Sequence, residues 1–403
     1  MFRKKKKDIS GESLGRKAWL RFKQNRLSMV SFWFLILAVF VAILGYVLTP
    51  DKTPFCNQQH LELSTKKPGF TCQFLLVRKN THIEKPNFFK SIIQGTENPY
   101  YEIPISNYIF KDNFIEVENY TSKEDSSGIK KNYLLADVCF ALRNPNGKQI
   151  KQSVDIHGNN LTHTSVELIQ KIEQKHILNK RFLLGTDRYG RDLLSRLILG
   201  TRISLSVGFI AVLISLIVGI TLGILAGYFR GVIDDVIMWL INVVWSIPTL
   251  LIVIAITLVM GKGFWVIFVA VGLTMWVEVA RVTRGQVLSV REMEYVEAAR
   301  ALGYSNTRIM FRHILPNVFS PLIVISAANF ASSILIEAGL SFLGIGVQPP
   351  IPSWGTMIKA HYGYIIMDKA YLAFLPGIAI MLMVLTFTLI GNGLRDALDT
   401  KSE

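Results

Sequence analysis

Long apolar stretches alternate with polar ones along the 403 residues of the chain. A helix that crosses a membrane needs about 20 mostly apolar residues. Six stretches meet this requirement, at residues 29–49, 204–228, 236–260, 264–282, 322–340 and 372–390. The fifth stretch contains Asn329, Glu337 and several small residues, which favour packing inside a helix bundle over contact with lipid. The pattern predicts an all-α membrane protein with six spans.

The segment between the first two spans, residues 51–181, is polar and long enough to form a core of its own. Within it, residues 69–77, 100–110 and 133–142 are rich in aromatic and branched side chains, which predicts strands. Residues 164–177 carry apolar side chains at helical spacing. We therefore expect a small α+β insertion in an otherwise helical protein.

Charge gives the orientation of the spans. The chain has a formal net charge of +15, and the basic residues Lys4 to Lys7, followed by Arg16, Lys17, Arg21, Lys23 and Arg26, precede the first span. Basic residues beside a first span keep that end in the cytoplasm. Six spans then place the C-terminus and residues 284–316 in the cytoplasm and residues 51–181 outside. Nucleic-acid binding is disfavoured because no basic fold follows, and the first apolar run lacks a signal-peptide cleavage site.

All three cysteines lie in the 51–181 segment. Cys56 and Cys72 would form a disulfide in an oxidising compartment, with Cys139 left over, or all three are free and buried. The histidines of the segment show no zinc-ligand spacing with these cysteines, so we expect no metal site.

A short helical run lies between the fourth and fifth spans. Glu297, Ala298 and Ala299 belong to a helix predicted over residues 295–302, and Gly303 allows the left-handed turn that ends it. Leu315 and Pro316 then open the next helix, where proline is well tolerated. An ordinary amphipathic cytoplasmic helix is the alternative interpretation of this run.

This spacing resembles the coupling loop of ATP-binding-cassette importer permeases, although His313 stands where that family usually has an apolar residue. The resemblance implies that residues 295–302 dock on a cytoplasmic ATPase. It also implies a type I importer transmembrane domain with six helices.

A second motif precedes the second span and consists of Gly185, Asp187, Gly190, Arg191 and Asp192. We expect an amphipathic segment at the membrane surface here. With the blocks 338–350, 352–355 and 391–399, the motif resembles the second, C-type membrane subunit of oligopeptide, dipeptide and nickel permeases.

The resemblance is loose over residues 16–49 and good over residues 183–399. It divides the chain into 1–50, the cytoplasmic start and first span, 51–181, the extracytoplasmic insertion, and 182–403, the permease core. Asn242 and Asn392 stand where the family often has aspartate, so an ion pair at those positions is not expected to carry over.

The chain carries no glycine-rich phosphate-binding loop and no catalytic constellation. We therefore expect no enzyme activity and no cofactor bound by this chain. The resemblance implies that ATP and Mg²⁺ are used by partner ATPases.

Charged groups inside spans are costly and indicate function or pairing. We expect Glu278 and Arg281, three residues apart on one helix, to have a structural role together with Arg284. Glu337 either lines the translocation path or anchors the loop that follows it. Ser246 and Pro248 mark either a simple bend or a hinge in the third span.

The resemblance implies a peptide permease subunit in a bacterial inner membrane, and the charge pattern predicts that both termini are cytoplasmic. The implied partners are a second, different permease, two cytoplasmic ATPases, a peptide-binding protein outside and the lipid bilayer, without nucleic acid. A nickel or metal-complex permease is the alternative within transport. A membrane receptor or scaffold, or a lipid-embedded enzyme, are the alternatives from other classes.

Overall fold

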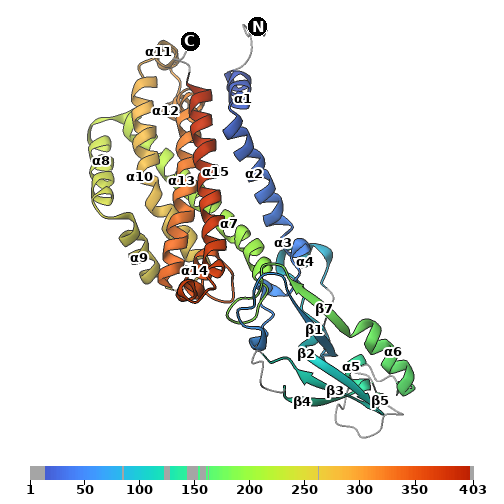
Figure 1. Ribbon diagram of the computed structural model, residues 1–403. Coiled ribbons are helices and arrows are strands. Elements are labelled where there is room, and N and C mark those ends of the chain that lie inside the picture. Colours follow the sequence, from blue (N-terminus) through green and yellow to red (C-terminus); the bar gives the residue numbers. More distant parts are fainter. Residues whose placement is uncertain are drawn as a thin grey trace, which may run out of the picture. The chain divides into compact units, whose positions relative to one another are not determined.

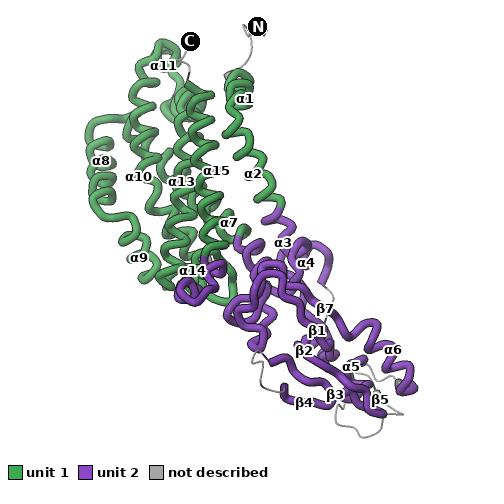
Figure 2. The backbone as a smooth tube through the Cα atoms, in the orientation of Figure 1, with its two compact units in different colours: residues 1–40, 201–359, 374–403 green, residues 41–200, 360–373 purple. Residues whose placement is uncertain are grey.

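The computed structural model describes residues 14–83, 86–121, 128–142, 153–154, 160–161, 163–261 and 263–399. The chain forms two compact units, each described here by itself (Figures 1 and 2). Unit 1 comprises residues 1–40, 201–359 and 374–403, and unit 2 comprises residues 41–200 and 360–373. Lys4 to Lys7, on which the predicted orientation partly depends, lie outside the described residues.

Unit 1 is helical. Its helices are α1 (Leu14–Gln24), α2 (Arg26–Ile43), α7 (Leu193–Phe229), α8 (Gly231–Trp245), α9 (Thr249–Met260), α10 (Phe264–Val290), α11 (Glu294–Ala301), α12 (Asn306–Arg308), α13 (Leu315–Leu343), α14 (Trp354–His361) and α15 (Tyr371–Leu398). The ends of α2, α7, α14 and α15 extend into unit 2. A wider helical turn over Ile309–Ile314 joins α12 to α13.

Five described helices are long and apolar enough to cross a membrane, at Arg26–Ile43, Leu193–Phe229, Trp265–Val290, Asn306–Leu343 and Tyr371–Leu398. They correspond to five of the six predicted spans. The first is shorter than predicted, because α2 ends at Ile43 and a separate short helix, α3 (Gly45–Leu48), follows.

The third predicted span, 236–260, is bent where Ser246 and Pro248 predict a bend, and it consists of two helices. Helices α8 and α9 meet at an angle of 92°. Ser246 ends α8 and Pro248, which has no backbone N–H to donate, precedes α9. The apolar pattern continues through this break, so the serine and the proline were the features of the sequence that indicated it.

Helix α7 packs closely on α10 through a row of glycines. A Cβ atom built on Gly219, Gly223 or Gly227 would lie 2.5–2.9 Å from atoms of α10. Small residues at every fourth position let two helix backbones approach in this way, as is common in membranes. The second and fourth spans, α7 and α10, are therefore a tightly packed pair.

Unit 2 contains a five-stranded antiparallel sheet with the order β4-β3-β2-β1-β7. The strands are β1 (Phe70–Arg78), β2 (Tyr100–Lys111), β3 (Phe114–Asn119), β4 (Lys130–Leu134) and β7 (Ile177–Phe182), and a separate pair is formed by β5 (Ser153–Val154) and β6 (Asn160–Leu161). The helices are α4 (Phe88–Gln94), α5 (Leu135–Cys139) and α6 (Ser165–Lys175), with short helical turns at Pro54–Cys56, Leu61–Leu63 and Tyr362–Ile366.

The strands predicted at 69–77 and 100–110 and the helix predicted at 164–177 match β1, β2 and α6. The strand predicted at 133–142 is wrong, because the chain leaves the sheet after Leu134 and forms α5. The apolar side chains of α5 enter the core beside Leu75, Ile115 and Leu168, so their burial does not require a strand. Strands β3 and β7 were not predicted.

The three cysteines are buried and unbonded, which matches the second of the two alternatives. Burial raises the pKa of Cys72 and of Cys139 to about 11. Unit 2 also holds residues 360–373, where the Tyr371 hydroxyl donates to the carbonyl of Lys66 at 2.7 Å.

Candidate functional sites

The predicted coupling helix is α11, which begins at Glu294 and ends at Ala301, one residue from the expected bounds. Its inner face consists of Val296 and Ala299, which are buried, while Glu297 and Ala298 are exposed. Gly303 has a φ of +75°, and the N–H of Tyr304 donates to the carbonyl of Ala299 at 3.2 Å. The glycine therefore ends α11 as expected.

The inner face of α11 packs on the ends of two long helices. Val296 and Ala299 share one buried cluster with Ile224 of α7 and Val318 of α13. Leu315 and Pro316 lie in the first turn of α13, as predicted. His313, the residue that departs from the family pattern, stacks on Tyr304 with ring centroids 5.8 Å apart. Helix α11 is thus packed directly against both α7 and α13.

Residues 185–192 form a compact buried loop in unit 2, not the amphipathic surface segment that we predicted. Asp187 is 1% exposed and accepts hydrogen bonds from the N–H groups of Tyr189 and Arg191 at 2.8 and 3.0 Å. Arg191 adds a side-chain bond from Nε to Asp187 Oδ2 at 2.7 Å. Asp187 and Arg191 pair with each other and are buried, and Arg188 is the exposed charged residue of the loop, so these charges do not form a solvated face.

The remaining three residues of this motif have backbone roles. Gly185 and Gly190 have φ of +79° and +71°, and a Cβ on either would overlap the backbone carbonyl of Lys66 or His60. Asp192 accepts a hydrogen bond from the N–H of Ser195 at 2.8 Å, which caps the start of α7. The motif therefore fixes the point at which the chain enters α7.

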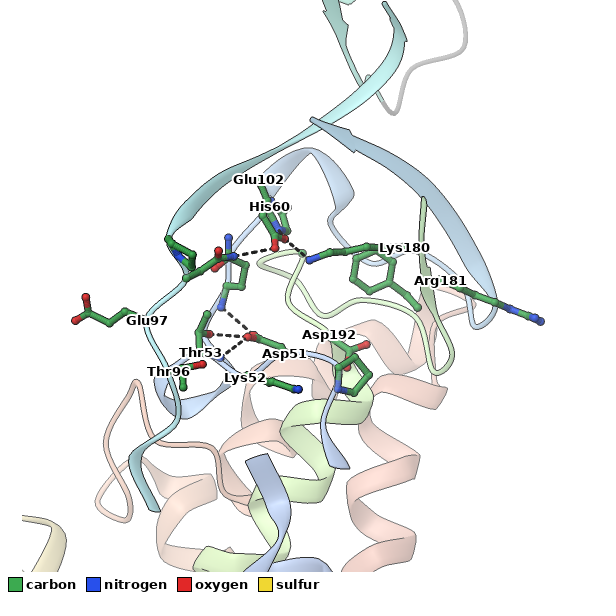
Figure 3. Close-up of a pocket in the computed structure, with 16 residues that line it drawn as sticks. Asp51, Lys52, Thr53, His60, Thr96, Glu97, Glu102, Lys180, Arg181 and Asp192 are labelled. Carbon is green, nitrogen blue, oxygen red and sulfur yellow. Dashed lines mark hydrogen bonds and ion pairs between the residues drawn. The ribbon is translucent and has the colours of Figure 1, made fainter. Parts of the chain in front are cut away.

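A cavity of about 370 Å³ lies in unit 2 and is shown in Figure 3. Glu102 is its central acid and lies within 2.5 Å of Lys180 Nζ, 2.8 Å of Asn98 Nδ2 and 3.5 Å of His60 Nε2. Burial opposes ionisation of Glu102, but hydrogen bonds and charge from His60 and Lys180 outweigh it and lower its pKa to about 2. On the other side, Asp51 accepts from the N–H groups of Thr53 and Gln58. These acids hold the walls of the cavity together.

A second cavity, of about 240 Å³, lies in unit 1 beside the break between α8 and α9. Twelve residues line it, namely Val244, Trp245, Ile247, Thr249, Ile252, Thr274, Met275, Val277, Glu278, Asn329, Ser332 and Ile336. They come from α8, α9, α10, α13 and the break itself. Its polar groups are therefore gathered from segments far apart in the sequence. We call it the membrane cavity.

The structure separates the residues that we proposed for the translocation path from this cavity. Ser246 and Pro248 lie in the break but are not among the lining residues. Glu337 is fully buried and accepts a hydrogen bond from Ser341 Oγ at 2.7 Å, which in turn accepts from the N–H of Val347 at 3.1 Å. This geometry fits the anchoring role for Glu337, the alternative to lining the path.

Two arginines of α10 contact α8. Arg281 Nη2 donates to Asn242 Oδ1 at 3.2 Å, and its guanidinium carbon lies 3.6 Å from the ring centroid of Trp245. An ion pair between Glu278 and Arg281, which their spacing allows, is not among the ion pairs of the described residues, and Arg281 contacts α8. Asn242 thus makes a neutral contact where the family often has aspartate.

Comparison with known proteins identifies the family. Residues 219–403 match the family described as the binding-protein-dependent transport system inner membrane component. Residues 13–68 match the N-terminal transmembrane domain of oligopeptide transport permease C. The glutathione transport system permease protein GsiD of Pectobacterium atrosepticum is 43% identical over 218 residues, which cover 54% of this chain and 72% of that protein. The chain belongs to the binding-protein-dependent transport permeases.

A second relative of this permease is the di/tripeptide transport system permease protein DppC of Pseudomonas aeruginosa. It is 46% identical over 222 residues, which cover 55% of this chain and 73% of that protein. Among solved structures, a chain of the MetNI methionine ABC transporter in an inward-facing conformation covers 51% of this chain and 98% of its own length, with 18% identity and a TM-score of 0.43. The family is one of transport subunits, so this permease is a transport protein and not an enzyme.

Sequence reasoning missed the membrane cavity of this permease. Glu278 was given a structural role because Arg281 stands three residues away, and Asn329 was taken as a packing residue. The available signal was the combination of a bent span with polar residues inside the two spans that follow, Glu278 and Asn329. Each of these features was visible alone, but only the structure brings them to one cavity.

Proposed function

We propose that this permease is the C-type membrane subunit of an ATP-driven importer that carries peptides into a bacterial cell. The names of both relatives refer to peptides, since glutathione is a tripeptide. The complete importer would contain a second, different permease, two cytoplasmic ATPases and a peptide-binding protein outside the membrane. Both termini of the chain and α11 would then face the cytoplasm, and residues 51–181 would face outward.

The observation that carries this proposal is the placement of α11. Its outer face is open, with Leu302 just beyond its end 72% exposed, while its inner face is fixed to α7 and α13. A partner bound to that outer face would move both long helices when it moves. ATP and Mg²⁺ would be used by the ATPases, and this chain would bind no cofactor of its own.

Reconstitution tests the proposal. The permease, its partner permease, both ATPases and the binding protein are placed in liposomes, and uptake of a labelled tripeptide is followed with and without ATP. ATP-dependent uptake of the tripeptide supports the proposal. Uptake of Ni²⁺ and not of the tripeptide would favour the metal permease, and uptake of neither would favour a receptor or scaffold.

A further inference from the structure

Glu278 is an acidic residue inside a predicted membrane span. It lies near the middle of the 27-residue helix α10, among apolar residues, and its side chain is exposed. A carboxylate inside a membrane-spanning segment is costly, and such groups usually face a bundle interior or a water-filled cavity. Glu278 is therefore expected to face away from lipid, and it does line the membrane cavity.

The neighbouring charges do not neutralise Glu278. Arg281 is turned toward α8, where it contacts Asn242 and the face of Trp245. Arg284, one turn further on, makes two hydrogen bonds with Asp234, at 2.5 and 2.6 Å. Within the described part of the chain, Glu278 takes part in none of the ion pairs.

Asn329 has a buried amide group that lacks a hydrogen-bond partner among the described residues. It lines the same cavity from α13 and is 2% exposed, yet its Nδ2 group has no hydrogen-bond partner among the described residues. A buried amide donor without a partner costs about 1–3 kcal/mol. Such a group is explained when a ligand or water completes its hydrogen bonds.

The non-helical backbone beside the membrane cavity also indicates a polar or water-filled site. Trp245, Ile247 and Thr249 surround the break between α8 and α9 and line the cavity. Non-helical backbone at membrane depth is tolerated only where it is buried in protein or lines a water-filled space. Broken helices of this kind commonly contribute to substrate sites in transporters.

We propose that the membrane cavity binds the ammonium end of the transported cargo. The carboxylate of Glu278 pairs with a primary ammonium, and the Asn329 amide donates to the adjacent carbonyl oxygen. The apolar walls, with Met275, Ile252 and Ile336, hold the first side chain. A volume of about 240 Å³ suits one end of a short peptide and not the whole molecule. This inference rests on the proposed function and specifies how one subunit recognises the cargo.

The test uses the complete reconstituted importer and two labelled probes, trialanine and N-acetyl-trialanine. Glu278→Gln removes the negative charge with little change in shape, and Asn329→Leu removes the amide. Glu173→Gln, on the exposed surface of α6, is the matched control because it removes a carboxylate far along the chain from the cavity. Selectivity of the binding protein is the same for every variant, so it cancels in the ratio of variant to wild type.

We expect Glu278→Gln and Asn329→Leu to lower trialanine uptake about tenfold or more, mainly through KM, and acetylated-peptide uptake less than twofold. If the wild type does not carry the acetylated peptide, the KM for trialanine becomes the test of the inference. This KM should rise in both variants but not in Glu173→Gln. The inference would be overturned if uptake of both peptides fell equally, or if the KM for trialanine did not change. It would also be overturned if Glu278→Gln lost its partner subunits on purification. If the wild type takes up trialanine and the variants do so equally well, the inference fails while the proposed function stands. If the wild type takes up no trialanine, the proposed function and the inference both fail.

Discussion

Arg284 of α10 and Asp234 of α8 form a two-pronged ion pair, with Nε–Oδ1 and Nη2–Oδ2 separations of 2.5 and 2.6 Å. One turn earlier on α10, Arg281 contacts α8 only through the neutral Asn242 and the ring of Trp245. Helix α8 is therefore held to α10 by one ion pair and one neutral polar contact, in addition to the apolar contacts of Ile237 and Ile241.

The Asp234–Arg284 pair should contribute to stability. Asp234→Ala leaves a half-buried guanidinium without its carboxylate, and hydrogen bonds to charged groups contribute about 1.5–3 kcal/mol. We expect a lower unfolding temperature for the detergent-solubilised subunit, measured by differential scanning fluorimetry. Asn242→Asp, which offers Arg281 a full charge, should leave the unfolding temperature equal or higher. Equal unfolding temperatures for Asp234→Ala and wild type would show that the pair is screened.

Gly303 provides a test of coupling. Its φ of +75° is unfavourable for a β-branched residue, whereas a Cβ there meets no atom within 4 Å. Gly303→Val should therefore reduce ATP-dependent uptake several-fold through backbone strain alone, with normal insertion. Gly303→Asn should retain most of the uptake because asparagine tolerates the left-handed conformation. Similar uptake by the valine variant and the wild type would contradict the role of α11 in coupling.

Where periodicity and turn chemistry determine structure locally, the sequence was sufficient. Helix α11, its glycine end and the start of α13 at Leu315 and Pro316 depend on propensity and backbone geometry, which act over a few residues. Strands β1 and β2 were predicted for the same reason. The coupling segment could therefore be predicted almost residue by residue.

Other features depend on contacts between distant segments. Ser246 and Pro248 predict a bend between α8 and α9, but the sequence alone does not give its angle of 92°. Residues 135–139, which are apolar apart from Asp137, fit a strand or a helix equally well, and they form α5 because their apolar side chains pack into the core. Likewise, Asp187 looked like part of a solvated face because its partner Arg191 is recognised only when the loop is folded.

Glu102 predicts a pH dependence for unit 2. Its folded pKa of about 2 lies below the ordinary value of 4.5, so its ionised form is stabilised by the fold. Because the fold lowers the pKa of Glu102, its contribution to the free energy of unfolding is complete above about pH 4.5 and is lost as the pH falls toward 2. The measurement is the unfolding temperature of the subunit between pH 7 and pH 2.5. Glu102→Gln should lower it at pH 7 and reduce the difference between the two pH values, and an unchanged pH dependence would contradict this assignment.

The orientation of the chain is tested by thiol labelling in intact cells. Cysteines are introduced singly at Ser106, exposed on β2, and at Ala301, exposed at the end of α11, in a background with Cys56, Cys72 and Cys139 replaced by alanine. Basic residues before the first span are expected to hold the N-terminus inside. An impermeant maleimide should then modify the cysteine at 106 but not the one at 301, and both should react after the cells are opened. The background without cysteines controls for labelling of other proteins. Labelling at 301 and not at 106 in intact cells would reverse the orientation, and α11 would then be out of reach of a cytoplasmic ATPase.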